Sequence, residues 1–125
     1  MFDWTLYLKL AERLYASAAD EADLRSAVSR AYYAAFNEAR QYVRREFPEV
    51  FIDKDAAAHG KVWDTLASKG RSREEVETGR RGNMLRRDRN KADYDGTVPV
   101  KHNQVRLVIR QANDIIDALY RTGGG

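Results

Sequence analysis

Residues 24–43 read LRSAVSRAYYAAFNEARQYV, and this stretch determines the expected fold. Its apolar side chains recur every three or four positions without a break, which is the spacing of one face of an α-helix. They are Leu24, Val28, Ala31, Tyr32, Ala35, Phe36, Ala39, Tyr42 and Val43. Asp20 or Asp23 can cap this helix at its start, and Pro48 should stop it a few residues after Val43. We therefore predict one long amphipathic helix whose apolar face lies in the core.

The rest of the chain also shows helical spacing, and no segment alternates between apolar and polar residues as a half-buried strand would. Caps and stops divide it into further helices. Asp3 can start a first helix over about residues 4–18, Asp53 or Asp55 can start the third helix, and Gly70 ends it. Ser72 with Glu75 starts the fourth helix, and the Asp95-Gly96-Thr97 turn with Pro99 separates it from the last helix. The last helix carries a second long apolar stripe between Val105 and Leu119. We predict an all-α fold: an antiparallel up-and-down bundle of four to five helices, with its core built by the second and fifth helices.

The predicted fourth helix differs from the others because it has few apolar residues. Val76, Met84, Leu85 and Ala92 stand among many arginines. A helix this polar needs a further reason to form and to stay docked. A two-fold partner that covers part of it would be such a reason, so we expect a homodimer.

Length and composition narrow the class of protein. The chain has 125 residues, no cysteine and a net charge of +3, which suits one domain at residues 1–122 followed by a flexible glycine tail at 123–125. Without cysteine there is no disulfide or thiolate metal site, and His59 and His102 are too far apart in sequence to suggest zinc, so we expect no metal and no other cofactor. No apolar run approaches the ~20 residues of a membrane span, and charges interrupt the N-terminal stretch. We expect a cytoplasmic protein with no membrane association.

A basic run lies between Arg80 and Lys91, with six basic residues against the single carboxylate of Asp88. Such a run usually marks a solvated helix face, whereas an arginine-rich run can also face phosphates. Within it, Arg86 and Arg89 are three residues apart, and Asp93 follows four residues after Arg89, so the three share one helix face. Arg89 and Asp93 should form an ion pair that orients the guanidinium group toward a phosphate. The alternative is an ordinary surface pair of little consequence.

Two further side chains are candidates for a site. Tyr32 belongs to the apolar stripe, and Tyr33 lies beside it, where it can face a groove or a partner; the simpler interpretation is that both pack in the core. His59 lies near the start of the third predicted helix, where the helix field favours a neutral imidazole. It can bind an anion there, or it can simply be hydrogen-bonded within the fold.

Three stretches together resemble the prokaryotic HEPN family, whose name stands for higher eukaryotes and prokaryotes nucleotide-binding. They are LRSAVSRAYYAAFNEAR at 24–40, HGKVWDTL at 59–66 and RRDRNKADYD at 86–95, and the resemblance extends from about Leu6 to Leu119. It implies an antiparallel helical bundle that forms homodimers. Many members are metal-independent endoribonucleases, which act as toxins paired with a nucleotidyltransferase antitoxin or in defence against phage.

The resemblance also implies a site. The catalytic arginine of the family matches Arg89, but the histidine that follows it in the family would fall at Tyr94, Asp95 or Gly96. If this chain cleaves RNA, Arg89 would neutralise charge on the scissile phosphate, Asp93 would hold Arg89, and Tyr94 would hydrogen-bond the phosphate or protonate the leaving oxygen. The residues expected to bind RNA or a nucleotide are Arg86, Arg87, His59 and Tyr33.

Two functions compete at this point. The first is an RNA- or nucleotide-binding protein of the toxin–antitoxin or defence type, in which ribonuclease activity is in question because the histidine is missing. The second is a non-catalytic helical dimer that binds a partner protein such as a nucleotidyltransferase, with its arginines engaged in salt bridges. The arginine run favours the first function, and the missing histidine favours the second.

Overall fold

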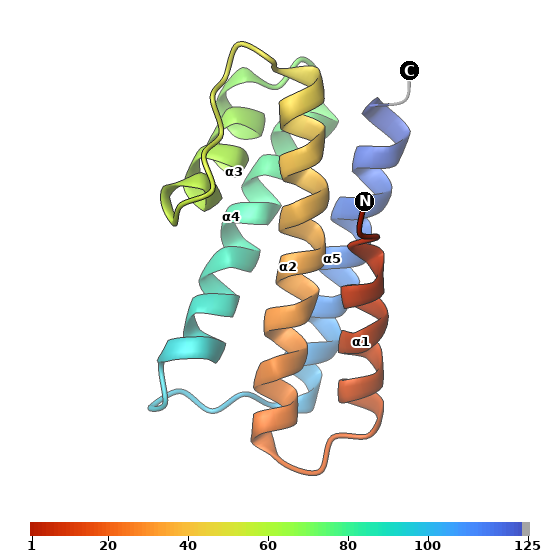
Figure 1. Ribbon diagram of the computed structural model, residues 1–125. Helices are drawn as coiled ribbons and strands as arrows, with labels where there is room; N and C mark the ends of the chain where they lie inside the picture. Colours follow the sequence, from red (N-terminus) through yellow and green to blue (C-terminus); the bar gives the residue numbers. More distant parts are fainter. Residues whose placement is uncertain (124–125) are drawn as a thin grey trace.

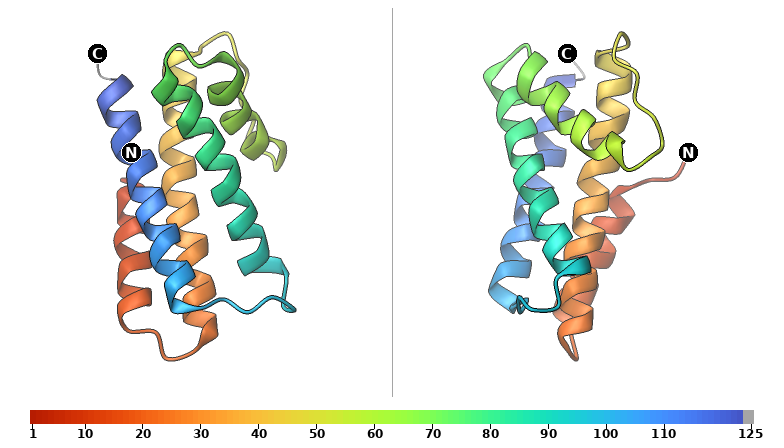
Figure 2. Two further views of the ribbon diagram at one scale, coloured as in Figure 1. Left: turned by 180° about the vertical axis from the view of Figure 1, so that it is seen from behind. Right: turned by 90° about the vertical axis from the view of Figure 1, so that its left-hand side faces the viewer.

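The computed structural model describes residues 1–123, and this part of the chain consists of five α-helices without a strand (Figure 1). They are α1 (Thr5–Ala16), α2 (Glu21–Glu46), α3 (Ala57–Lys69), α4 (Arg73–Tyr94) and α5 (His102–Gly123). The prediction of an all-α bundle is confirmed. Residues 47–56 run back along the bundle, so that α3 rises in the same general direction as α2 and then pairs with the descending α4 (Figures 1 and 2).

The caps expected from the sequence account for several helix boundaries. The side chain of Asp20 accepts a hydrogen bond from the backbone N–H of Asp23 at 3.2 Å, so Asp20 is the N-cap of α2. Ser72 accepts one from the N–H of Glu75 at 3.1 Å and opens α4. Neither candidate before α3 is its N-cap residue, which is Ala56, although Asp55 accepts a hydrogen bond from the N–H of Ala57. The first helix is shorter than expected, because it ends at Ala16.

The long helix α2 lies at the centre of the fold and packs against each of the other four helices. Its buried residues include Tyr32, Phe36 and Tyr42, and α5 contributes Ile115 and Leu119 to the same core. On one side α2 and α5 pack with α1, and on the other side α2 meets the α3–α4 pair (Figure 2). This arrangement places one face of α2 opposite the start of α3 and the C-terminal half of α4.

The polar helix α4 docks through glycines. A Cβ atom on Gly79 would lie 2.4 Å from the backbone nitrogen of Ala67, and one on Gly82 would lie 1.9 Å from Cε3 of Trp63. Because hydrogen atoms replace side chains at these two positions, α4 approaches α3 closely enough to cover the buried indole of Trp63. The thin apolar stripe of α4 is therefore explained within a single chain, and it no longer serves as evidence for a two-fold partner.

The turn after α4 is held by Arg25 of α2. Its guanidinium group donates to the carbonyl oxygens of Ala92 at 2.9 Å, Asp95 at 3.1 Å and Val98 at 2.6 Å. A cation at the C-terminus of a helix is favourable because the last carbonyl groups lack partners within the helix. Arg25 thus ties the end of α4 to α2.

Of the three C-terminal glycines, the structure describes only the first. Gly123, which the sequence analysis placed in the tail, is the last residue of α5. The other two residues of the predicted flexible tail at 123–125 lie outside the described residues. Within residues 1–123, no helix combines the length and the low charge that crossing a membrane requires.

Candidate functional site

A chain of hydrogen bonds connects the core to His59 at the start of α3. The indole N–H of Trp63 donates to the hydroxyl oxygen of Tyr32 at 3.1 Å, and that hydroxyl lies 2.8 Å from Nδ1 of His59. Trp63 and Tyr32 are both completely buried. The imidazole ring stacks on Phe36, with 4.0 Å between the ring centroids. His59 is therefore held by α2 as well as by its own helix.

The charge state of His59 follows from these surroundings. Burial lowers its pKa to about 4, and the nearby guanidinium groups of Arg89, Arg86 and Arg40 act in the same direction. The imidazole is neutral at physiological pH. The position of His59 near a helix start also predicted a neutral imidazole, through the helix field, whereas burial and three arginines cause it here.

Arg89 of α4 crosses to α2 and contacts the same cluster. Its Nη2 donates to the hydroxyl oxygen of Tyr33, and its Nη1 donates to Oδ1 of Asn90 at 2.7 Å. The guanidinium carbon lies 5.0 Å from the ring centroid of Tyr33 and 5.5 Å from that of Tyr32, which are cation–π distances. Only 8% of the residue is exposed. Arg89 therefore does not belong to an ordinary surface pair, because the tyrosines of α2 cover it.

The predicted pair of Arg89 with Asp93 is present, and its geometry is looser than expected. Nε of Arg89 lies 3.0 Å from Oδ2 of Asp93, but the N–H does not point along this line and forms no hydrogen bond within residues 1–123. Oδ2 of Asp93 instead accepts a hydrogen bond from Ser29 at 3.2 Å. Asp93 therefore balances the charge of Arg89, while Tyr33 and Asn90 fix its orientation.

The remaining predicted residues divide into two groups. Arg86 joins the cluster, because its guanidinium group lies close to Gly60, next to His59. Arg87 is exposed, and so is Tyr94, although its ring centroid is 5.6 Å from the guanidinium carbon of Arg89. The basic run from Arg80 to Lys91 thus does not form one patch, because successive helical residues point in different directions.

A pocket of about 400 Å³ opens beside His59 and Tyr33. Its wall contains three cationic side chains that the sequence analysis did not select: Arg30 and Arg40 of α2, and Lys54 of the segment before α3. The full lining is Trp4, Tyr7, Arg30, Tyr33, Phe36, Asn37, Arg40, Lys54, Asp55 and His59. The sequence could have predicted part of this lining, because a three-four-three spacing places four residues on one face of the helix. They are Arg30, Tyr33, Asn37 and Arg40. Lys54 and His59 join them only through the fold.

Two of these cations are already oriented by aromatic and amide groups. The guanidinium carbon of Arg30 lies 5.0 Å from the ring centroid of Tyr7, and that of Arg40 lies 5.5 Å from the centroid of Phe36. Nη2 of Arg40 also donates to Oδ1 of Asn37 at 2.8 Å. Asp55 is the only carboxylate in the lining, so positive charge predominates in this pocket.

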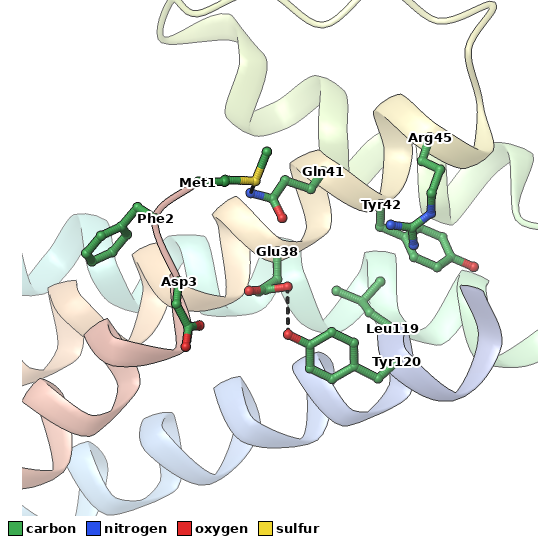
Figure 3. A pocket seen from close by; sticks show the side chains of 9 residues that line it. All are labelled: Met1, Phe2, Asp3, Glu38, Gln41, Tyr42, Arg45, Leu119 and Tyr120. Atoms are coloured by element: carbon green, nitrogen blue, oxygen red, sulfur yellow. Dashed lines mark hydrogen bonds between the residues drawn. The ribbon is translucent and has the colours of Figure 1, made fainter. Parts of the chain in front are cut away.

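A different pocket of about 540 Å³ lies between the N-terminal residues, α2 and the end of α5 (Figure 3). Its side chains include the carboxylates of Asp3 and Glu38 and the guanidinium group of Arg45. Tyr120 donates to Glu38 at 3.1 Å, and burial raises the pKa of that carboxyl group. None of the predicted site residues lines it, and two carboxylates against one cation make it unsuited to a phosphate.

Comparison with known proteins does not assign the chain to a family. No family model, no curated protein and no solved structure matches the chain. Within residues 1–123, no group of three histidine, aspartate or glutamate side chains is placed to hold a metal ion. The basic, aromatic pocket beside His59 is the candidate functional site.

Proposed function

We propose that this chain binds the phosphate groups of RNA or of a nucleotide in the pocket beside His59. The observation that carries the proposal is the convergence of Arg30, Arg40 and Lys54 with His59 on one pocket with a single carboxylate. Arginine and lysine side chains supply most phosphate contacts in nucleic-acid-binding proteins. A neutral imidazole adds a hydrogen-bond donor or acceptor without a charge.

The aromatic lining of the pocket suits the other half of such a ligand. Trp4, Tyr7 and Tyr33 line its wall, and aromatic faces stack on nucleobases in proteins that bind single-stranded nucleic acid. A pocket of about 400 Å³ is within the size range of small-molecule sites and can accept one nucleotide unit. Stacking and phosphate contacts together favour a nucleotide or single-stranded RNA over a simple anion.

The proposal is one of binding, because the geometry gives less support to cleavage. The catalytic role expected for Arg89 needs a guanidinium group that a phosphate can reach, and only 8% of this residue is exposed. Asp93 and Tyr94, the other two members of the expected catalytic set, are exposed. The toxin–antitoxin or defence role and a nucleotidyltransferase partner rest on the resemblance to HEPN proteins.

Salt dependence of RNA binding tests the proposal. Anisotropy of a fluorescently labelled, short single-stranded RNA would be measured over a range of salt concentrations. Each phosphate contact contributes a log–log slope of about 0.7, so three cations predict a slope of about 2. The double variant Arg30→Gln/Arg40→Gln should bind at least about tenfold more weakly and show a smaller slope.

The matched control is Arg13→Gln/Arg106→Gln, which removes two exposed arginines outside the pocket, one on α1 and one on α5. It should leave most of the affinity intact. Equal losses for both double variants would indicate nonspecific attraction to a basic protein and would contradict the site. No binding of RNA or of a mononucleotide at low salt would remove the proposal itself.

We also propose that the chain forms a homodimer, as the resemblance implies. Met84 of α4 and Leu107 of α5 are 55% and 51% exposed and line a common pocket between the two helices. The same pocket contains Arg81 and Arg110 as well as Glu77 and Asp114. Apolar side chains surrounded by charges of both signs are typical of a surface that meets its own copy, since opposite charges can then pair across a two-fold axis.

A further inference from the structure

We infer that Tyr32 and Trp63 hold His59 in the Nε2–H tautomer, so that His59 acts as a neutral hydrogen-bond donor to a phosphate oxygen in the pocket. The tautomer is a property of the free protein. The identity of the acceptor rests on the proposed function. Tyr32 and Trp63 are positioning residues in this arrangement, because they act on the ligand through His59.

The direction of the hydrogen bonds among Trp63, Tyr32 and His59 follows from the indole N–H of Trp63, which lies at the buried end of this series. An indole N–H can only donate, so the hydroxyl oxygen of Tyr32 accepts from Trp63. The hydroxyl proton of Tyr32 must then find an acceptor. Within residues 1–123 the only other group that it contacts at hydrogen-bond distance is Nδ1 of His59. Tyr32 therefore donates to Nδ1, which must be unprotonated.

The opposite arrangement leaves a buried donor without a partner. If Nδ1 carried the proton, it would donate to Tyr32, and the hydroxyl proton of Tyr32 would have no acceptor in a residue that is fully buried. An unsatisfied buried donor costs about 1–3 kcal/mol. Burial also raises the pKa of Tyr32 to about 12, so the hydroxyl group keeps its proton at any physiological pH.

The second ring nitrogen of His59 is free to meet a ligand. Nε2 forms no hydrogen bond with residues 1–123, and it is not among their buried unpaired polar atoms, so it reaches solvent. His59 itself lines the pocket beside Tyr33 and Arg40. With Nδ1 occupied by Tyr32, the proton of the neutral ring is on Nε2, the ring nitrogen that reaches solvent.

Charges from every neighbouring element keep the imidazole neutral. Arg86 and Arg89 of α4 and Arg40 of α2 disfavour a second proton, and Lys54 lies in the same pocket wall. Asp55 is the one carboxylate there. A neutral N–H among cations suits an oxygen that is already negative, because the cations supply the attraction and the N–H supplies the direction. A phosphate oxygen has this chemistry, whether it belongs to inorganic phosphate, a nucleotide or an RNA backbone.

Nitrogen-15 NMR of the histidine side chains tests the inference in the intact protein. His102 is the only other histidine, so His102→Gln identifies the signals of His59. We expect an unprotonated Nδ1 and a protonated Nε2, unchanged between pH 5 and pH 8. Tyr32→Phe keeps the ring and removes the hydroxyl group, and it should give a mixture of tautomers. A protonated Nδ1 in the wild type overturns the inference, as does a His59 that titrates near its ordinary pKa.

The donor role is tested by adding inorganic phosphate, adenosine monophosphate or a short RNA to the same sample. The Nε2 signal should shift on binding, and His59→Phe should weaken binding about tenfold while His102→Phe leaves it unchanged. The probe that shifts the signal at the lowest concentration identifies the source of the phosphate. Binding that leaves the His59 signals unmoved overturns the donor role and leaves the proposed function standing. No binding of any probe overturns both.

Discussion

Gly82 of α4 lies directly against the indole ring of Trp63 in α3. A Cβ atom on Gly82 would lie 1.9 Å from Cε3 and 2.1 Å from Cδ2 of that ring. Trp63 is fully buried and donates to Tyr32, which in turn contacts His59. The absence of a side chain at Gly82 therefore allows α4 to close over the residues that position the candidate site.

Replacement of Gly82 by alanine should destabilise the protein. Alanine favours a helix over glycine by about 1 kcal/mol, but overpacking against a buried ring typically costs 1–3 kcal/mol or more. We expect a net loss of about 2 kcal/mol in urea unfolding. Gly96→Ala is the control, because a Cβ there meets no atom within 4 Å. Equal stability of the two variants would contradict the close packing of α4 on Trp63.

Replacement of Arg89 by alanine should also destabilise the fold, because the residue is buried. The change removes a buried guanidinium group with its bonds to Tyr33 and Asn90, and hydrogen bonds of charged groups contribute about 1.5–3 kcal/mol each. We expect a loss of about 3 kcal/mol or more by chemical denaturation, because two such bonds are removed. Arg87→Ala removes an exposed arginine two residues away and should change stability by less than about 0.5 kcal/mol. Similar small effects of both changes would show that Arg89 is not buried in solution.

The acid limb of the stability curve should depend on Glu75, which is 4% exposed. Burial alone would raise its pKa, but hydrogen bonds from Arg71 and Tyr42 outweigh burial and lower the pKa to about 2, from an ordinary 4.5. A depressed pKa stabilises the folded state fully above pH 4.5, and this contribution is lost as the pH falls through 2. The loss should reach about 3 kcal/mol.

Urea unfolding between pH 2 and pH 6 measures this contribution. Glu75→Gln cannot ionise, so its stability should fall less steeply than that of the wild type over this range. The difference between the two curves isolates Glu75 from other carboxylates with lowered pKa values, such as those of Asp3, Glu46 and Asp95. Parallel curves would contradict the role of the Arg71–Glu75–Tyr42 contacts.

The proposed homodimer predicts a specific effect at Met84. Sedimentation at tens of micromolar should show a dimer, since most specific dimers persist at this concentration. Met84→Glu places a charge on the exposed α4–α5 surface and should shift the protein to monomer without a loss of helix content. Leu6→Glu is the control, because Leu6 of α1 is also exposed, at 45%, and lies on another helix. A monomeric wild type would contradict the dimer, and a dimer in Met84→Glu would exclude this surface.

Local patterns in the sequence were sufficient to predict where the helices lie along the chain. Apolar spacing over residues 24–43 predicted α2, and the caps Asp20 and Ser72 predicted where helices begin, because both depend on residues within one or two turns. The same local geometry separated a buried Tyr32 from a partly exposed Tyr33. Helix periodicity and capping act over a few residues, so a single sequence contains them.

Only the tertiary structure decided what surrounds those residues. The burial of Arg89 depends on tyrosines more than fifty positions earlier in the chain, and the docking of α4 depends on glycines that meet α3. His59 joins Tyr32, and Lys54 joins Arg30 and Arg40, through packing between separate elements. Such contacts arise when helices pack face to face, and the distances and burial that they create depend on where each helix lies relative to the others, which no local spacing specifies.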